Sequence, residues 1–462
     1  MESGRCMKST SLFRQPEFLT DEDVPLHRIR CPVHGFIRFS ENERTIIDHW
    51  IFRRLRQIKQ LALTDLVYPG ACHTRFEHSL GVMELATRAF DQVAANRGAS
   101  LEANLKKVAE LREKPLAIAR ELVRLAALLH DIGHSCFSHA AETVIHEGSG
   151  HEGFTFKLVE EKEFLGDVLD KLYFAGFASL LGKVLRGGPV MPPQFKVLKD
   201  LVSGEMDADR SDYLLRDSHY CGVEYGRFDH RRMIQCLDLN DADGGVLEIG
   251  LHRDGIHTFE ALILARYQMN TQVYYHRIRR IYDYYLCQYF AEMGKAVFDT
   301  PSKILEQTDI QAMAMILQDA NKGGAEGPGK WAMRIRDRNH HRCVHETGED
   351  AKALDLKHSE RLFEKLKGKF PDVDFIFDVA KPTIHKLLLP DDTELGEFVA
   401  LPLIEPGGGT SYLGHRSHIL RNIAKRFQVA RIFADIGRDK QDLIRTVRSF
   451  AVDEYRKLGG QS

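Results

Sequence analysis

Three things that this sequence lacks narrow the kinds of protein it can encode. Its eight cysteines are scattered and form no CxxC pair, so neither a zinc ribbon nor a disulfide framework is indicated. No apolar run approaches the roughly 20 residues of a membrane-spanning helix. The formal net charge is only −2, so no global charge marks a surface for nucleic acid or a membrane. We therefore expect a cytoplasmic protein with reduced thiols and no membrane partner.

The composition that is present is typical of a large globular protein. With 462 residues, the chain is long enough for one large domain with an appendage, or for two to three ordinary domains. We divide it into a flexible N-terminal arm over residues 1–24, a core over residues 25–300 and a C-terminal lobe over residues 301–462. We expect the lobe to serve regulation or oligomerisation.

Helical periodicity dominates the predicted core, and short strands are few. The predicted helices cover residues 41–61, 74–89, 115–129, most of 154–240, and 258–298. The predicted strands cover residues 34–39, 246–249 in a hairpin with 250–256, 374–377 and 429–433, with a hairpin or flexible loop at 407–409. The sequence therefore favours a mainly α fold, with a helical core and a smaller α/β C-terminal lobe.

The residues His130 and Asp131 end an apolar helical run, Leu125–Leu129. Burying an ionised carboxylate without a partner is unfavourable, and a divalent cation supplies such a partner. Without a CxxC pair, nitrogen and oxygen atoms must hold that cation. His134 lies one helical turn beyond His130, so the two histidines share a face.

Two further segments offer ligands of the same kind, His78 within Arg75–Gly81 and Asp209 within Glu205–Tyr213. Two imidazoles and two carboxylates suit Mn²⁺, Fe²⁺, Mg²⁺, Ni²⁺ or Zn²⁺, and leave coordination positions for water and substrate. Asp207 or Asp212 takes the place of Asp209 if the turn has another register. The alternative for the whole set is an ordinary group of hydrogen-bonded or surface polar side chains.

The order H…HD…D and the segments around it resemble the HD-domain phosphohydrolases, and above all their deoxynucleoside triphosphate triphosphohydrolase branch. The resemblance covers roughly residues 30–290. The matching segments are Phe52–Leu61, Tyr68–Ala71, Arg75–Gly81, His130–His134, Phe137–His139, Asp209–Tyr213 and Tyr274–His276. It implies an HD-domain helical core and hydrolysis of dNTPs to deoxynucleoside and tripolyphosphate. It also implies a homo-oligomer, a tetramer or hexamer in this family, with a nucleotide effector.

The resemblance also implies roles for individual residues. The metal ligands would be His78, His130, Asp131 and Asp209, and the catalytic group would be His134, His139, Glu142 and His151. The substrate contacts would be Gln60 and Asp217 for the sugar, Tyr274 as the wall that excludes a 2′-hydroxyl, and Arg75, Arg210, Tyr213 and Arg266 for phosphate. Asp48 and Arg56 match residues that bind an activating nucleotide. Independently of any family, three arginines and a metal suit a polyanionic substrate.

The chain also departs from the pattern of the family's mammalian members. Glu142, Arg210 and Arg53 stand where those have Asp, Lys and Gln, and Asn270 and Tyr275 replace His and Gln. His146 competes with His151 for one role, and we prefer His151 because a helical pattern follows it.

Other functions stay open at this stage. The histidine group could orient metal ligands instead of acting in catalysis. The protein could hydrolyse a cyclic or signalling nucleotide, or bind nucleotides or nucleic acid through a vestigial site.

Overall fold

The computed structural model describes nine stretches of the chain. These are residues 27–146, 150–242, 245–294, 297–324, 326–349, 351–387, 399–407, 409–437 and 439–460. The arm predicted for residues 1–24 lies outside them. Within these stretches the cysteines are all free thiols. No helix there combines the length and the apolar character that crossing a membrane requires.

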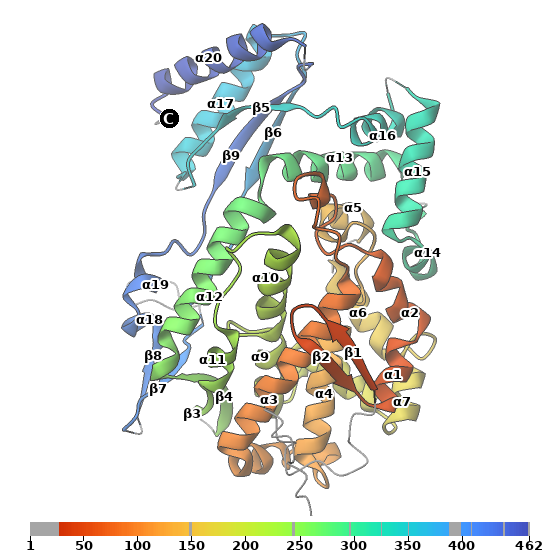
Figure 1. Ribbon diagram of the computed structural model, residues 1–462, viewed down its shortest axis with the longest axis vertical. Coiled ribbons are helices and arrows are strands. Elements are labelled where there is room, and N and C mark those ends of the chain that lie inside the picture. The colour runs from red at the N-terminus through yellow and green to blue at the C-terminus, as the bar shows by residue number, and fades with distance from the viewer. Residues whose placement is uncertain are drawn as a thin grey trace, which may run out of the picture.

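Two long helices lie side by side in the middle of the helical core, α3 (Arg75–Leu105) and α4 (Pro115–Leu129) (Figure 1). Proline at the first position of α4 suits a helix start, because the N–H that proline lacks would have no partner there. Every residue from Leu122 to Leu129 is buried, since α4 is covered by α3, α8 (Phe177–Arg186) and α9 (Lys196–Val202). The apolar run thus ends in the centre of the core.

The other helices up to residue 336 pack around this pair or beside one another. They are α1 (Glu41–Ile47), α2 (Trp50–Arg53), α5 (Glu142–Ile145), α6 (Gly150–Glu160), α7 (Gly166–Leu172), α10 (Ala208–Cys221), α11 (His230–Gln235), α12 (Ile256–Met269), α13 (Arg277–Met293), α14 (Pro301–Glu306), α15 (Asp309–Lys322) and α16 (Pro328–Arg336). The single helix predicted for residues 41–61 is wrong. The backbone of His49 is extended and its ring accepts a hydrogen bond from the Ile51 N–H, so a new helix begins there.

The strands of the described residues form three small sheets. Their bounds are β1 (His27–Cys31), β2 (Gly35–Phe39), β3 (Leu237–Ala242), β4 (Val246–His252), β5 (Arg342–Glu346), β6 (Phe375–Ala380), β7 (Pro402–Ile404), β8 (Thr410–Tyr412) and β9 (Val429–Ala434). The strands predicted at residues 34–39, 374–377 and 429–433 are confirmed. The antiparallel pairing of β7 with β8 agrees with the hairpin predicted at residues 407–409, of which residue 408 lies outside the described residues. The hairpin of 246–249 with 250–256 is wrong, because residues 246–252 form one strand, which pairs with β3.

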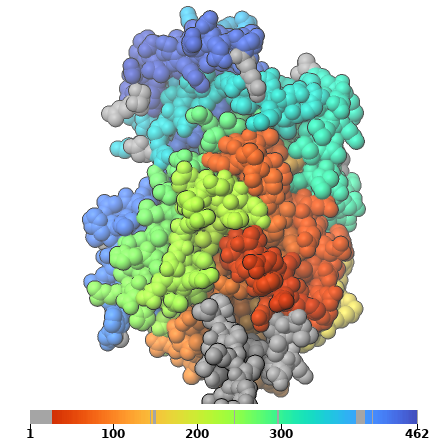
Figure 2. All heavy atoms as spheres, viewed as in Figure 1, coloured from red at the N-terminus to blue at the C-terminus, as the bar shows by residue number. Residues whose placement is uncertain are grey.

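Two apolar clusters organise these elements. The smaller one lies in the C-terminal lobe, where α17 (Ala353–Lys369) and α20 (Gln441–Lys457) pack on the antiparallel sheet β5-β9-β6. α17, α20 and this sheet form the upper end of the molecule, in cyan and blue (Figure 2). The larger cluster takes in the core and also Ile316 and Trp331 of α15 and α16.

The mainly α fold with a smaller α/β lobe is confirmed, whereas the boundary at residue 300 stays a prediction. Near β8 the chain also forms two short helices, α18 (Leu413–Arg416) and α19 (His418–Asn422).

Candidate metal centre and its pocket

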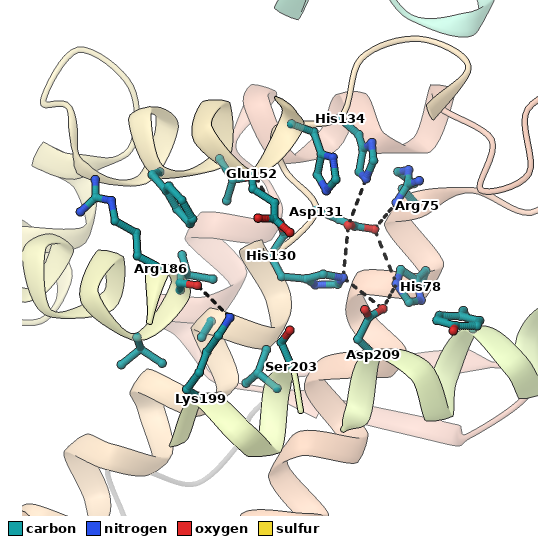
Figure 3. A pocket seen from close by; sticks show the side chains of 18 of the residues that line it. Arg75, His78, His130, Asp131, His134, Glu152, Arg186, Lys199, Ser203 and Asp209 are labelled. Atoms are coloured by element: carbon teal, nitrogen blue, oxygen red, sulfur yellow. Dashed lines mark hydrogen bonds and ion pairs between the residues drawn. The ribbon is translucent and has the colours of Figure 1, made fainter. Parts of the chain in front are cut away.

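The four predicted metal ligands come from three helices and meet at one place (Figure 3). His78 lies in the first turn of α3, His130 and Asp131 follow the end of α4, and Asp209 lies in the first turn of α10. The Nε2 atom of His78 is 3.1 Å from Asp209 Oδ1 and 3.5 Å from Asp131 Oδ2. The Nε2 atom of His130 is 3.3 Å from Asp131 Oδ1 and 3.5 Å from Asp209 Oδ1.

In both imidazoles, the Nδ1 atom points away from the centre and forms a hydrogen bond. The Nδ1 atom of His78 donates to Asp212 Oδ2, and that of His130 to the Ala127 carbonyl, each at 2.8 Å. Carbonyl oxygens and ionised carboxylates only accept, so each Nδ1 carries a proton, and each Nε2 faces the centre, where it can bind a cation once it is deprotonated. The His130 Nε2 is buried and has no hydrogen-bond partner. This arrangement fits a divalent cation, of unresolved identity, because the ligand atoms of His78, His130 and Asp209 lie within 4.8 Å of one another, and Asp131 lies next to both histidines.

The three nearby aspartates of the α10 segment have different surroundings. Asp207 begins α10 and accepts hydrogen bonds from the backbone N–H groups of Arg210 and Gly204. Asp212 accepts a hydrogen bond from His78 Nδ1, on the side of the ring away from the centre. Of the three, Asp209 is the one whose carboxylate lies within 4 Å of both Nε2 atoms. The geometry therefore favours the register with Asp209 at the centre.

The electrostatics of the centre favour positive charge. Burial lowers the pKa of His78, but its hydrogen bonds with Asp209 and Asp212 outweigh burial and raise the pKa to about 10. Burial likewise opposes ionisation of Asp131, but Arg75 and His130 hold the pKa of that carboxyl well below its usual range. Arg75 pairs directly with Asp131. A site that stabilises an extra proton this strongly has the charge needed to hold a cation.

The four predicted catalytic residues form one group beside the centre. The rings of His134 and His151 stack with centroids 3.7 Å apart, and the His139 ring lies 4.7 Å from His134. Glu142 accepts from His139 Nδ1 at 2.7 Å and from His151 Nδ1 at 2.5 Å, so one carboxylate orients both rings.

Within this group, burial lowers the pKa of both His134 and His139. Burial, with Arg75 and His151 nearby, holds the pKa of His134 well below its usual range, so this ring is neutral near pH 7. The competing His146 packs on Phe154 and lies outside the group. The roles of all four residues stay predictions.

A cavity of about 290 Å³ opens over the centre and the histidines. Of the predicted site residues, those lining it are Gln60, Arg75, His78, His130, Asp131, His134, His139, His151, Asp209 and Tyr213. The lining residues that the sequence did not predict are Ala126, Glu152, Thr155, Phe156, Val184, Leu185, Arg186, Lys199, Val202 and Ser203.

Four predicted substrate contacts do not line this cavity: Arg210, Asp217, Arg266 and Tyr274. The Tyr274 hydroxyl donates to Asp217 Oδ2 at 2.7 Å, and His73 Nε2 lies 2.7 Å from the other oxygen. Arg210 is occupied by the Gly204 carbonyl and by Glu205. The Nε of Arg266 is buried without a partner. In this structure Asp217 and Tyr274, the expected sugar contacts, are therefore hydrogen bonded to each other.

The two predicted effector residues have different surroundings. Asp48 lines a shallow depression at the end of α1 and pairs with Arg44 at 3.5 Å. The guanidinium of Arg56 instead lies over the Phe76 ring, 3.5 Å from its centroid. The effector site stays a prediction.

A buried carboxylate from α15, Asp309, joins two loops of the site. Its oxygens accept from the backbone N–H of Phe137 at 2.7 Å and of Lys59 at 2.9 Å. The first loop carries His139 and the second carries Gln60. Phe137 and Ser138 have φ of 56° and 53°, a left-handed conformation that non-glycine residues rarely adopt and that needs support. No signal in the sequence pointed to Asp309, because its contacts are entirely tertiary.

Replacing Asp309 by asparagine should lower turnover at saturating substrate roughly tenfold, about 1.4 kcal/mol, with metal content unchanged. Burial raises the pKa of Asp309 to about 6, so at pH 8 the carboxylate accepts from both loops. An amide offers one acceptor and turns an N–H group against the other donor. Asp319→Asn on the same helix is the control, since Asp319 contacts Lys322 and Tyr289. Equal kcat in both variants would contradict the role of Asp309.

Comparisons with known proteins agree with this geometry. Residues 75–185 match the HD domain, and residues 228–362 match the HD associated region. An uncharacterized protein of Methanocaldococcus jannaschii is 37% identical over 255 residues, which are 55% of this chain and 47% of that protein. The deoxynucleoside triphosphate triphosphohydrolase SAMHD1 of Gallus gallus is 31% identical over 278 residues, 51% of this chain and 42% of that protein. The chain spans about half the length of the curated relatives it matches.

Solved structures share the fold over most of the chain. A hypothetical protein from Aquifex aeolicus superimposes with a TM-score of 0.72 at 28% identity, over 92% of this chain and 99% of that one. A phosphohydrolase from Bacteroides thetaiotaomicron has a TM-score of 0.67 at 23% identity, over 88% of this chain and 99% of that one, and shows the fold alone. This chain contains an HD domain followed by an HD-associated region, and it resembles the HD-domain dNTP triphosphohydrolases.

Proposed function

We propose that this protein is a metal-dependent hydrolase that splits dNTPs into deoxynucleoside and tripolyphosphate. The observation that carries the proposal is the convergence of the Nε2 atoms of His78 and His130 with two carboxylates, beside Arg75 and the histidine group. A divalent cation held there would lower the pKa of bound water and polarise a phosphoryl oxygen. The relatives named as deoxynucleoside triphosphate triphosphohydrolases support dNTPs as the substrate class.

The surrounding side chains supply the rest of the proposed reaction. Arg75 lines the cavity and offers N–H donors to a phosphate next to Asp131. Water attacks the α-phosphorus, and the bond to the 5′ oxygen breaks. His139 is more than half exposed, and its Nδ1 donates to Glu142. Burial lowers the pKa of this ring, so in the proposed reaction it first takes up a proton at Nε2 and then passes it to the departing oxygen. The neutral His134 serves as a hydrogen-bonding contact instead.

The proposed sugar contacts lie on the other side of Tyr213, whose ring is 6.0 Å from that of Tyr274. A 3′-hydroxyl would take the place of the Tyr274 hydroxyl at Asp217, and the Tyr274 ring would close the space for a 2′-hydroxyl. The resemblance to the family adds two proposals, a homo-oligomer and a nucleotide effector near Asp48 and Arg56.

One observation favours a second candidate, a phosphohydrolase of the same fold that acts on a cyclic or signalling nucleotide. The cavity at the metal centre does not extend to Asp217 and Tyr274, the residues expected to select a deoxyribose.

A matrix of divalent metals against the four dNTPs, mixed and separate, tests the proposal. Chromatography should resolve deoxynucleoside and intact tripolyphosphate in equal amounts. Release of orthophosphate or pyrophosphate would favour the second candidate. Salt-dependent binding of single-stranded nucleic acid without turnover under any metal would instead indicate a binding protein.

A further inference from the structure

The cavity continues past the metal centre into a part that none of the expected substrate contacts lines. Here it runs between α4, α6, α8 and α9, and its walls include the apolar side chains of Ala126, Val184 and Val202. Lys199 of α9 reaches into this part. In the view of Figure 3, Lys199 and Arg75 lie on opposite sides of His130.

Lys199 is unusual because it is partly buried and forms no ion pair with a described residue. No carboxylate of the described residues lies within ion-pair distance of its ammonium, whereas Lys196, one turn earlier on α9, pairs with Asp200 at 2.6 Å. Burial lowers the pKa of Lys199 and outweighs the opposing effect of carboxylates such as Glu152 and Asp207, so this position disfavours the charged amine. A charged amine at such a position is stabilised either by a hydrogen-bond acceptor of the protein or by an anionic ligand.

A hydrogen-bond acceptor of the protein satisfies only part of the donor capacity of Lys199. The Lys199 ammonium donates to the Leu185 carbonyl at 2.9 Å, and Leu185 lies in the last turn of α8, where carbonyl groups lack helical partners. An ammonium has three N–H donors, so this capping bond leaves two of them for water or a ligand.

We propose that Lys199 binds phosphoryl oxygens of the phosphate chain, in the substrate and in the tripolyphosphate product, at the end of the cavity away from Arg75. The proposal rests on the proposed function and identifies where part of that polyanion lies. An ammonium only donates, so it selects an anionic acceptor, and its hydrogen bond to a phosphate is charge-assisted. The metal ligands and Lys199 line one cavity, so a single extended anion can reach both.

Calorimetric titration of sodium tripolyphosphate into the manganese-loaded protein tests this directly. Lys199→Met should weaken binding roughly tenfold or more, because a charge-assisted hydrogen bond is lost. Lys196→Met removes the same charge from the same helix outside the cavity, and should change the affinity less than twofold. Lys199→Arg should keep most of the affinity.

A second variant separates binding from capping. Lys199→Gln keeps a donor for the Leu185 carbonyl but has no charge, so it should retain the melting temperature and still lose tripolyphosphate affinity. It also decides the question if Lys199→Met fails to fold. Wild-type affinity in Lys199→Gln, with metal content intact, would overturn the inference and leave Lys199 as a helix cap.

These titrations require no turnover, so they distinguish the two proposals. A protein that cleaves no dNTP but binds tripolyphosphate through Lys199 would refute the proposed reaction alone. A protein that cleaves dNTPs while Lys199→Gln binds tripolyphosphate normally would refute the Lys199 subsite alone.

Discussion

Metal content and turnover should both collapse when Asp209 is replaced by alanine. Its Oδ1 atom lies within 4 Å of both histidine Nε2 atoms, so its loss removes the carboxylate that both imidazoles share. We expect turnover to fall at least about a thousandfold, which corresponds to about 4 kcal/mol. Elemental analysis of the purified protein, together with product chromatography, measures both effects.

Replacing Asp209 tests the metal centre more clearly than replacing Asp131. Asp131 pairs with the buried Arg75, and taking it away would leave an uncompensated buried charge that destabilises the protein by itself. The side chain of Asp209 is 32% exposed, so its variant should stay folded. Asp200→Ala on the neighbouring helix α9 is the control and should keep full metal and activity. Normal metal content and turnover in Asp209→Ala would reject the assigned centre.

The second large effect is expected when Asp212 is replaced, because its carboxylate accepts a hydrogen bond from His78 Nδ1. Its carboxylate accepts from Arg216 at 2.8 and 2.9 Å and lies 2.5 Å from His34 Nε2, and Arg216 is completely buried. Asp212→Ala should lower the free energy of unfolding by about 3–5 kcal/mol, because Arg216 is left without its partner. Metal affinity should fall about 10- to 100-fold, since His78 loses its orientation.

A double variant separates these two effects of Asp212. Asp212→Ala combined with Arg216→Met has no unpaired buried charge, so thermal unfolding of the metal-free protein should show part of the stability restored. Metal affinity, measured by titration, should stay low because nothing holds His78. If both quantities recovered together, Asp212 would act only through the stability of the core.

The sequence could predict which side chains meet at the centre because each lies within a local pattern. His130 and Asp131 end a helix whose apolar run and leading Pro115 are visible in the sequence. His78 and Asp209 both lie in first turns of helices. A helix start was predicted near residue 74 for His78, whereas Asp209 was identified from the segment that resembles the family. Local periodicity and resemblance were sufficient for this part.

Contacts between distant segments could not be predicted in this way. Asp309 and Phe137 are 172 residues apart, and only the packing of α15 on the core brings them together. In the sequence, Lys199 is one more charged residue on an amphipathic helix. Its hydrogen bond to the Leu185 carbonyl of α8 is a tertiary contact, which only the structure shows. The pairing of β4 was wrong for a different reason. β3 and β4 are neighbours in the sequence, but residues 237–242 alternate only from Leu237 to Asn240, which is too short to mark a strand next to the helical pattern before it.

The chain passes from the lobe back to the core before its end. After β6 it adds β7 to β4, with Leu251 opposite Leu403 and His252 opposite Ile404, and then returns to form β9 between β5 and β6. A protein shortened after α16 would therefore expose a bare backbone edge on β4. Such edges promote strand-to-strand aggregation, so the helical half of this molecule is not a separable unit.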